Sequence, residues 1–146
     1  MTTLTDFLAR GRGVAVAAAD ARELSSATAS SSPRLVTVRG SRMRTKAALL
    51  DEMSAALQFP LDFGANWDAL ADCLGDVTGT GGARAVVIVI AQAEQVLRDE
   101  ADALPTFLAV LDDRDVHAVL PIAAAGVRAA VQAAWAESGL AVGAVE

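Results

Sequence analysis

Two aspartates spaced one helical turn apart are the residues whose arrangement first suggests a function. Asp68 and Asp72 lie in the segment 59–76, FPLDFGANWDALADCLGD, where a helix is predicted from Trp67 to about Leu74. Residues four apart share one edge of a helix, so the two carboxylates repel each other by about 0.2–0.5 kcal/mol. The helix dipole favours Asp68 in the first turn but gives Asp72 no such support. The pair is either a solvated acidic face or a surface that binds a cationic partner.

The other groups of reactive residues have spacings that argue against catalysis or metal binding. Cys73 as a nucleophile with His117 as its base lacks a nearby cation that would favour the thiolate. The glycine-rich loop Gly79-Thr80-Gly81-Gly82 precedes a strand and lacks the Gly-Lys-Ser/Thr of a phosphate loop. The carboxylates within 99–102 match no calcium loop, and one Cys and one His cannot complete a zinc site. We therefore predict no catalytic residue, no cofactor and no metal.

The charge distribution favours a basic protein partner over a nucleic acid. The formal net charge is −6, and residues 60–115 contain eleven acids and three arginines. Phosphate binding needs clustered Lys and Arg, whereas an acidic segment attracts a basic partner over a distance. With one cysteine the chain forms no internal disulfide, and its longest apolar run, Ala85 to Ala91, is too short for a membrane span. We expect a cytoplasmic protein that contacts neither nucleic acid nor membrane, with secretion as a minor alternative.

The elements that must position the acidic pair alternate between strand and helix patterns. This alternation predicts an α/β fold with a small, mainly parallel sheet flanked by helices. Strands are predicted at 13–19, 35–38, 85–90, 116–122 and 140–145, and the helices at 21–29, 45–57, 67–74, 103–112 and 127–137. An acidic helix or turn is expected over 92–102, and a loose loop over 75–82.

Helical periodicity and capping residues indicate how these helices begin and which faces they bury. Thr45 and Asn66 are predicted N-caps because their side-chain oxygens can accept from free backbone N–H groups. The residues predicted to face inwards are Leu49, Leu50, Met53, Ala56, Leu57, Trp67, Leu70, Leu74, Phe107, Leu108, Leu111, Val127, Val131 and Trp135.

The motif around the acidic pair resembles a known family. The stretch Phe63-Gly64-x-Asn66-Trp67-Asp68-Ala69-Leu70-x-Asp72-Cys73-Leu74, led by Pro60, is similar to the recognition loop and following helix of barstar-like ribonuclease inhibitors. The similarity extends less sharply from about Leu35 to Ile122. It implies a small parallel sheet flanked by helices, and an inhibitor that needs no catalytic residue or cofactor.

The resemblance also implies roles for individual residues. Asp72 would mimic an RNA phosphate at the centre of a ribonuclease active site, with Asp68 beside it, both facing Arg, Lys or His. Gly64 would shape the loop and approach the partner with its backbone. Asp113, with Asp112 as the alternative, falls near a further acidic contact of the family.

Two positions depart from the family pattern. The prototype has a tyrosine where this chain has Asp62, and a large aromatic residue where it has Ala71. Both are contact positions in the family, and aromatic anchors often dominate interface energy, so their loss suggests a different or weaker partner. The predicted partner-binding set is Asp62, Phe63, Gly64, Asn66, Asp68, Ala71, Asp72 and Asp113.

We divide the chain into three segments and assign a function to the central one. Residues 1–33 are an N-terminal extension, either a strand plus helix or partly disordered; residues 34–123 are the barstar-like domain; residues 124–146 add a helix and a further strand packed on it. The expected function is a non-enzymatic inhibitor of a barnase-type ribonuclease or related toxin, with the oligomeric state left open. The alternatives are an immunity or regulatory protein against a non-ribonuclease toxin, and a small enzyme with a carboxylate-lined pocket.

Overall fold

The computed structural model describes part of the chain. The described residues are 13–17, 34–79, 86–112, 118–121, 126–137 and 142–145. Side chains are described for residues 36–75, 88–111 and 126–137. The predicted helix over 21–29, the glycines of 81–82, Asp113 and His117 lie outside the described residues.

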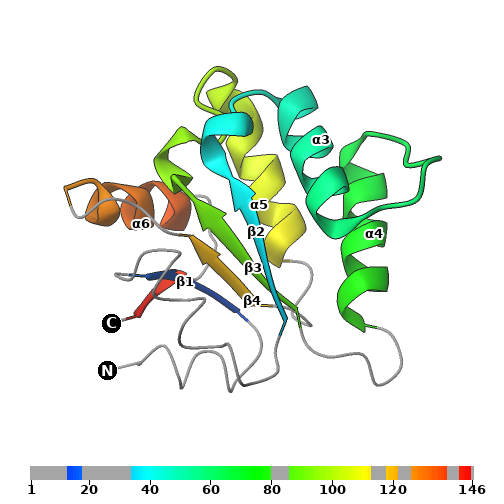
Figure 1. Cartoon of the computed structure of the whole chain (residues 1–146). Helices are drawn as coiled ribbons and strands as arrows, with labels where there is room; N and C mark the ends of the chain where they lie inside the picture. The colour runs from blue at the N-terminus through cyan, green and yellow to red at the C-terminus, as the bar shows by residue number, and fades with distance from the viewer. Residues whose placement is uncertain are drawn as a thin grey trace.

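Within these residues, five strands form one sheet in which every pair of neighbours is parallel (Figure 1). The sheet order is β2-β3-β4-β1-β5. The strands are β1 (Gly13–Ala17), β2 (Arg34–Arg39), β3 (Val86–Ala91), β4 (Ala118–Pro121) and β5 (Val142–Val145). The α-helices are α3 (Lys46–Leu57), α4 (Trp67–Gly79), α5 (Leu104–Asp112) and α6 (Arg128–Ala136), and the 3-10 turns are η1 (Gly40–Arg42), η2 (Ala93–Gln95) and η3 (Ala101–Ala103). The prediction of an α/β fold with a small parallel sheet is confirmed.

The register of the strands places residues from both ends of the chain side by side. β3 pairs with β2 from Arg34↔Val86 onwards and with β4 from Val87↔Ala118 onwards, so it is an interior strand. Ile88, Val89 and Ile90 are fully buried, as the unbroken apolar run predicts. β1 inserts between β4 and β5, so the predicted strands near the two ends of the chain both join this sheet.

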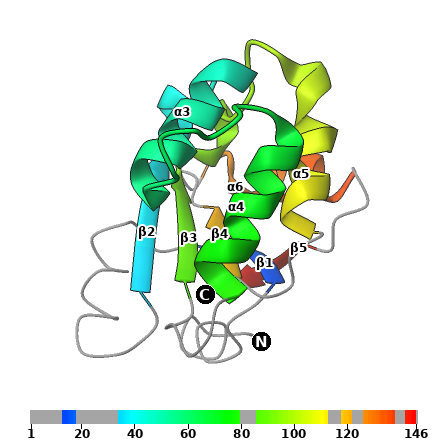
Figure 2. The ribbon, with the colours of Figure 1, turned by 90° about the vertical axis from the view of Figure 1, so that its right-hand side faces the viewer.

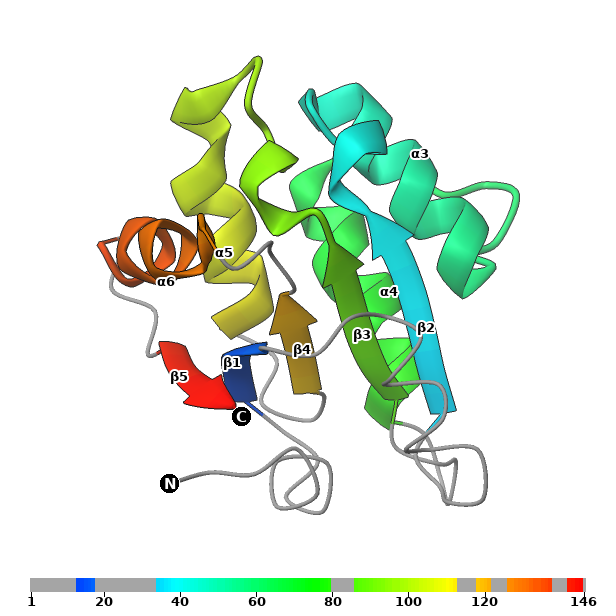
Figure 3. The ribbon, with the colours of Figure 1, turned by 60° about the vertical axis from the view of Figure 1, so that its left-hand side comes forward.

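The helices bury the faces that their periodicity predicts. Figures 2 and 3 show α4 and α5 over one face of the sheet. The helix α6 packs against β1 and β5, the last two strands in the sheet order. The buried helical side chains are Leu49, Leu50, Met53, Leu57, Leu70, Leu74, Phe107, Leu108, Leu111, Val131 and Trp135. None of the described helices is long and apolar enough to span a membrane.

The predicted positions of two side chains are wrong. Val127 precedes the first turn of α6 and is 36% exposed, since the helix begins one residue later. Trp67, placed in the core by its spacing, is half-buried at the start of α4.

One predicted element boundary also differs from the structure. α4 continues to Gly79, whereas the glycines of 75–82 predicted a loop from Gly75 onwards. The packing of the preceding helical turns outweighs the cost of about 1 kcal/mol that a glycine imposes on a helix. Of the helix or turn expected over 92–102, the structure has turns: two 3-10 turns form here, and Gln92 and Leu97 adopt left-handed φ values of 52° and 55°, which prevent a continuous helix.

A glycine lets the end of β2 approach the end of β3. A Cβ atom at Gly40 would lie 2.0 Å from the carbonyl oxygen of Gln92 and 2.9 Å from that of Ala91. Both contacts are with backbone atoms, which cannot rotate away as a side chain does. The structure therefore requires glycine at this crossing.

We predict that Gly40→Ala lowers the free energy of unfolding by about 1–3 kcal/mol, because the added methyl group forces the two backbones apart. Gly126→Ala is the matched control, since nothing lies within 4 Å of a Cβ there. The control should change the free energy of unfolding by less than about 0.5 kcal/mol. Urea denaturation of the three proteins provides the comparison, and equal stabilities would contradict the close approach at Gly40.

Candidate protein-binding surface

The loop between α3 and α4 begins where the backbone leaves the helix in a left-handed turn. Gln58 caps α3 with φ 55°, and Phe59 donates its N–H to the carbonyl of Ser54 at 3.0 Å. Pro60 then prevents any continuation of the helix. The side chain of Phe59 is buried, so the loop starts from a fixed point on the core.

A tight turn forms the tip of this loop. The N–H of Phe63 donates to the carbonyl of Pro60 at 3.0 Å, which makes Leu61 and Asp62 the two central residues of the turn. Both side chains are exposed. Phe63 returns to the protein, where its ring lies 5.0 Å from that of Phe59, and it packs against the core. The turn is thus anchored on both sides by aromatic rings.

Asn66 joins the loop to α4, and its predicted role as N-cap is confirmed. Its Oδ1 accepts from the N–H of Ala69 at 2.7 Å, and its Nδ2 donates to the carbonyl of Gly64 at 3.3 Å. Ala65 between them has a left-handed φ of 50°, which is unfavourable for a residue with a side chain. The Asn66 amide therefore holds both the start of the helix and the bend before it.

The helix α4 separates its apolar side chains from its carboxylates. Leu70 and Leu74 are completely buried, and Asp68 and Asp72 are exposed along the opposite edge. Ala71 lies between the two faces and is half-buried. Asp68 stands in the first turn, where the partial positive charge of the helix N-terminus favours it.

A lysine of α3 lies over the tryptophan that begins α4. The Nζ atom of Lys46 lies 5.4 Å from the ring centroid of Trp67, a cation–π distance, and that ring lies 6.1 Å from the ring of Phe107. Between residues 47 and 83 the sequence contains no Lys, Arg or His. The loop and the helix therefore carry carboxylates without a basic residue of their own.

The carboxylates considered for a metal site bind protein groups instead. Asp99 accepts from Nη2 of Arg44 at 2.8 Å, and Glu100 accepts from the backbone N–H of Lys46 at 3.1 Å. No group of three metal-binding side chains occurs in the part of the chain that the structure describes. Cys73 is half-buried against the core, so it is poorly placed to act as a nucleophile.

Seven of the eight predicted contact residues lie in the part of the chain that the structure describes. Asp62, Phe63, Gly64, Asn66, Asp68, Ala71 and Asp72 all lie on the loop or on the first two turns of α4. Asp113 lies outside the described residues, and for Asp112 only the backbone at the end of α5 is described. Sequence reasoning missed Leu61, although its position after Pro60 and off the helical stripes was a signal of exposure.

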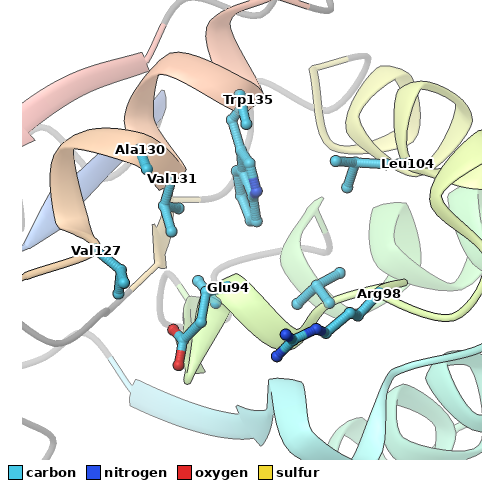
Figure 4. A pocket seen from close by; sticks show the side chains of 10 residues that line it. Glu94, Arg98, Leu104, Val127, Ala130, Val131 and Trp135 are labelled. Carbon is cyan, nitrogen blue, oxygen red and sulfur yellow. The ribbon is translucent and has the colours of Figure 1, made fainter.

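A separate cavity of about 410 Å³ lies between η2, α5 and α6. Figure 4 shows Trp135 and Val131 of α6 on one side of it, and Glu94 and Arg98 of the segment after β3 on the other. Its walls are mainly apolar, and Asp68 and Asp72 do not line it. The acidic pair is thus a feature of an exposed helix edge, separate from this cavity.

Residues 34–137 match the family model described as Barstar (barnase inhibitor). No curated protein matches the chain.

Solved structures resemble the chain in fold. A chain in the structure of Drosophila ORC bound to GC-rich DNA and Cdc6 aligns with a TM-score of 0.56 and 10% identity, over 96% of this chain and 51% of that one. The Walker-type ATPase paby2304 of Pyrococcus abyssi aligns with a TM-score of 0.56 and 10% identity, over 99% of this chain and 54% of that one. The present chain spans about half the length of each, and at such identities the likeness shows the fold alone.

We predict that Asn66→Ala lowers the free energy of unfolding by about 1 kcal/mol, because the N–H of Ala69 loses its acceptor. Asn66→Asp retains that acceptor and should stay within about 0.5 kcal/mol of the wild-type protein. Thermal or urea unfolding of the three proteins measures the difference. An equal loss in both variants would assign the effect to the Nδ2 bond with Gly64 instead of the cap.

Proposed function

The chain belongs to the barstar family, and from this we propose that it inhibits a microbial ribonuclease by inserting the acidic loop and α4 into the enzyme's cationic active site. Barstar-family proteins are inhibitors, so the chain is a barnase-inhibitor-like protein at the level of the family.

The observation that carries this proposal is the exposed carboxylate pair on one edge of α4. A ribonuclease must hold RNA phosphates with Arg, Lys or His, and a carboxylate is the protein group that can take the place of a phosphate oxygen. Asp72 would occupy the central phosphate position and Asp68 the adjacent one, since both are exposed while the far face of the helix is buried.

The anchored loop supports the same proposal. Its turn and cap fix the backbone of residues 58–66 before binding, which lowers the entropy lost when a complex forms. Asp62, Phe63, Gly64, Asn66 and Ala71 would contact the enzyme around the carboxylate pair, and Asp113 would add a further acidic contact. The absence of basic residues between positions 47 and 83 favours fast association with a cationic partner.

We place this proposed function in the cytoplasm. The one cysteine suits a reducing cytoplasm, where an inhibitor would protect the cell from its own ribonuclease. No catalytic role is assigned to any residue, because blocking an active site needs binding energy alone.

A toxin that is not a ribonuclease is a second candidate partner. It is favoured by Asp62 and Ala71, where the family prototype carries aromatic residues that contact the enzyme. Asp62 is exposed and adds a negative charge, so a basic partner of different shape fits this surface.

We predict that the protein inhibits RNA cleavage by a barnase-type ribonuclease at stoichiometric concentration, and that inhibition weakens as salt rises. Asp72→Asn and Asp68→Asn should each raise the inhibition constant at least tenfold, which corresponds to about 1.4 kcal/mol. A titration of the enzyme at low and high salt, with RNA cleavage as the readout, measures both effects.

Asp51→Asn is the matched control. Asp51 is an exposed acid on α3, so its substitution changes the net charge equally without touching the proposed surface. An equal effect in this control would show that overall charge, not the edge of α4, drives inhibition. Failure of the wild-type protein to inhibit at large excess would count against a ribonuclease of this type and favour the second candidate.

A further inference from the structure

The tip of the acidic loop presents a large apolar side chain to solvent. Leu61 has a relative exposure of 108%, more than the 36% of Val127, the other exposed large apolar residue among those described. Exposed leucines are common singly, so the exposure alone carries no function. Its position on an anchored turn of the loop that leads into α4, the helix with the carboxylate pair, distinguishes Leu61.

The turn holds Leu61 in place before any partner arrives. Pro60 restricts the backbone on one side, and the hydrogen bond from Phe63 to Pro60 closes the turn at 3.0 Å. The rings of Phe59 and Phe63, 5.0 Å apart, fix the two ends on the core. A side chain offered on such a rigid support loses little backbone entropy when it is buried by a partner.

The rest of this surface has little apolar area to offer. Asp62 carries a charge where the family prototype has a tyrosine, and Ala71 offers only a half-buried methyl group where the prototype has a large aromatic residue. Interfaces commonly depend on a central apolar or aromatic anchor surrounded by polar contacts. Leu61 is the exposed residue of the loop that has the size and chemistry for this role.

We propose that Leu61 is the apolar anchor of the binding surface, and that the partner enzyme has an apolar recess directly beside the cationic groups that bind Asp62, Asp68 and Asp72. This inference rests on the proposed inhibitor function and specifies the partner further. An enzyme that has the cationic site without the recess is bound more weakly, so Leu61 determines which members of the enzyme class are inhibited.

The test compares the dissociation constants of variants for a barnase-type ribonuclease at several salt concentrations. Leu61→Ala should weaken binding about tenfold or more, because most of the buried apolar area is lost. The salt dependence should stay as in the wild-type protein, since no charge changes. Leu61→Met, which conserves volume and polarity, should restore most of the affinity.

Val127→Ala is the matched control, since it removes an exposed apolar side chain immediately before α6, a helix that lies away from the loop (Figure 1). It should leave the dissociation constant unchanged, and both alanine variants should retain the thermal stability of the wild-type protein. If the wild-type protein binds and Leu61→Ala binds equally well, the anchor role is overturned, and the inhibitor function still stands. A wild-type protein that does not bind would contradict the inhibitor function for this enzyme, and the anchor role with it.

Discussion

The burial of Leu70 and Leu74 is the constraint on which the binding surface depends. Both side chains are completely buried and lie four residues apart, so they permit one rotational setting of α4 against the core. With the helix in this orientation, the side chains of Asp68 and Asp72 are exposed to solvent. Turning the helix would bury two carboxylates without partners, at a high cost in free energy. The hydrophobic core therefore fixes the direction in which the carboxylates point.

The loop depends on the same helix through its first residue. Asn66 caps α4 and also contacts Gly64, so the start of the helix and the bend of the loop are fixed together. Phe59 and Phe63 attach the remaining residues to the core. The carboxylate edge of α4 and the tip of the loop at Leu61 therefore form one rigid unit. A rigid surface loses little conformational entropy when it enters a preformed active site.

Local patterns predicted much of this arrangement. The caps at Thr45 and Asn66 follow from the residue types, and the buried face of α5 follows from apolar residues three and four apart. The structure confirms both predictions. Features set by distant contacts were missed. The left-handed backbone of Gln92 and Leu97 depends on how whole elements pack, and the neighbouring residues in the sequence do not indicate it. The low helix propensity of glycine also gave a wrong prediction, that the helix ends before Gly75. The packing of other residues of α4 keeps this part of the chain helical.

The position of β1 has a consequence for the order in which the sheet forms. Gly13 pairs with Ala118, and Val14 pairs with Val142, so this early strand has both its neighbours near the far end of the chain. β2, β3 and β4 pair over much shorter separations, and contacts of low sequence separation cost less loop entropy. During synthesis on the ribosome, β1 can pair with β4 only after residues 118–121 have emerged, and with β5 only after residues 142–145 have emerged. Before residues 118–121 emerge, β3 is an open sheet edge.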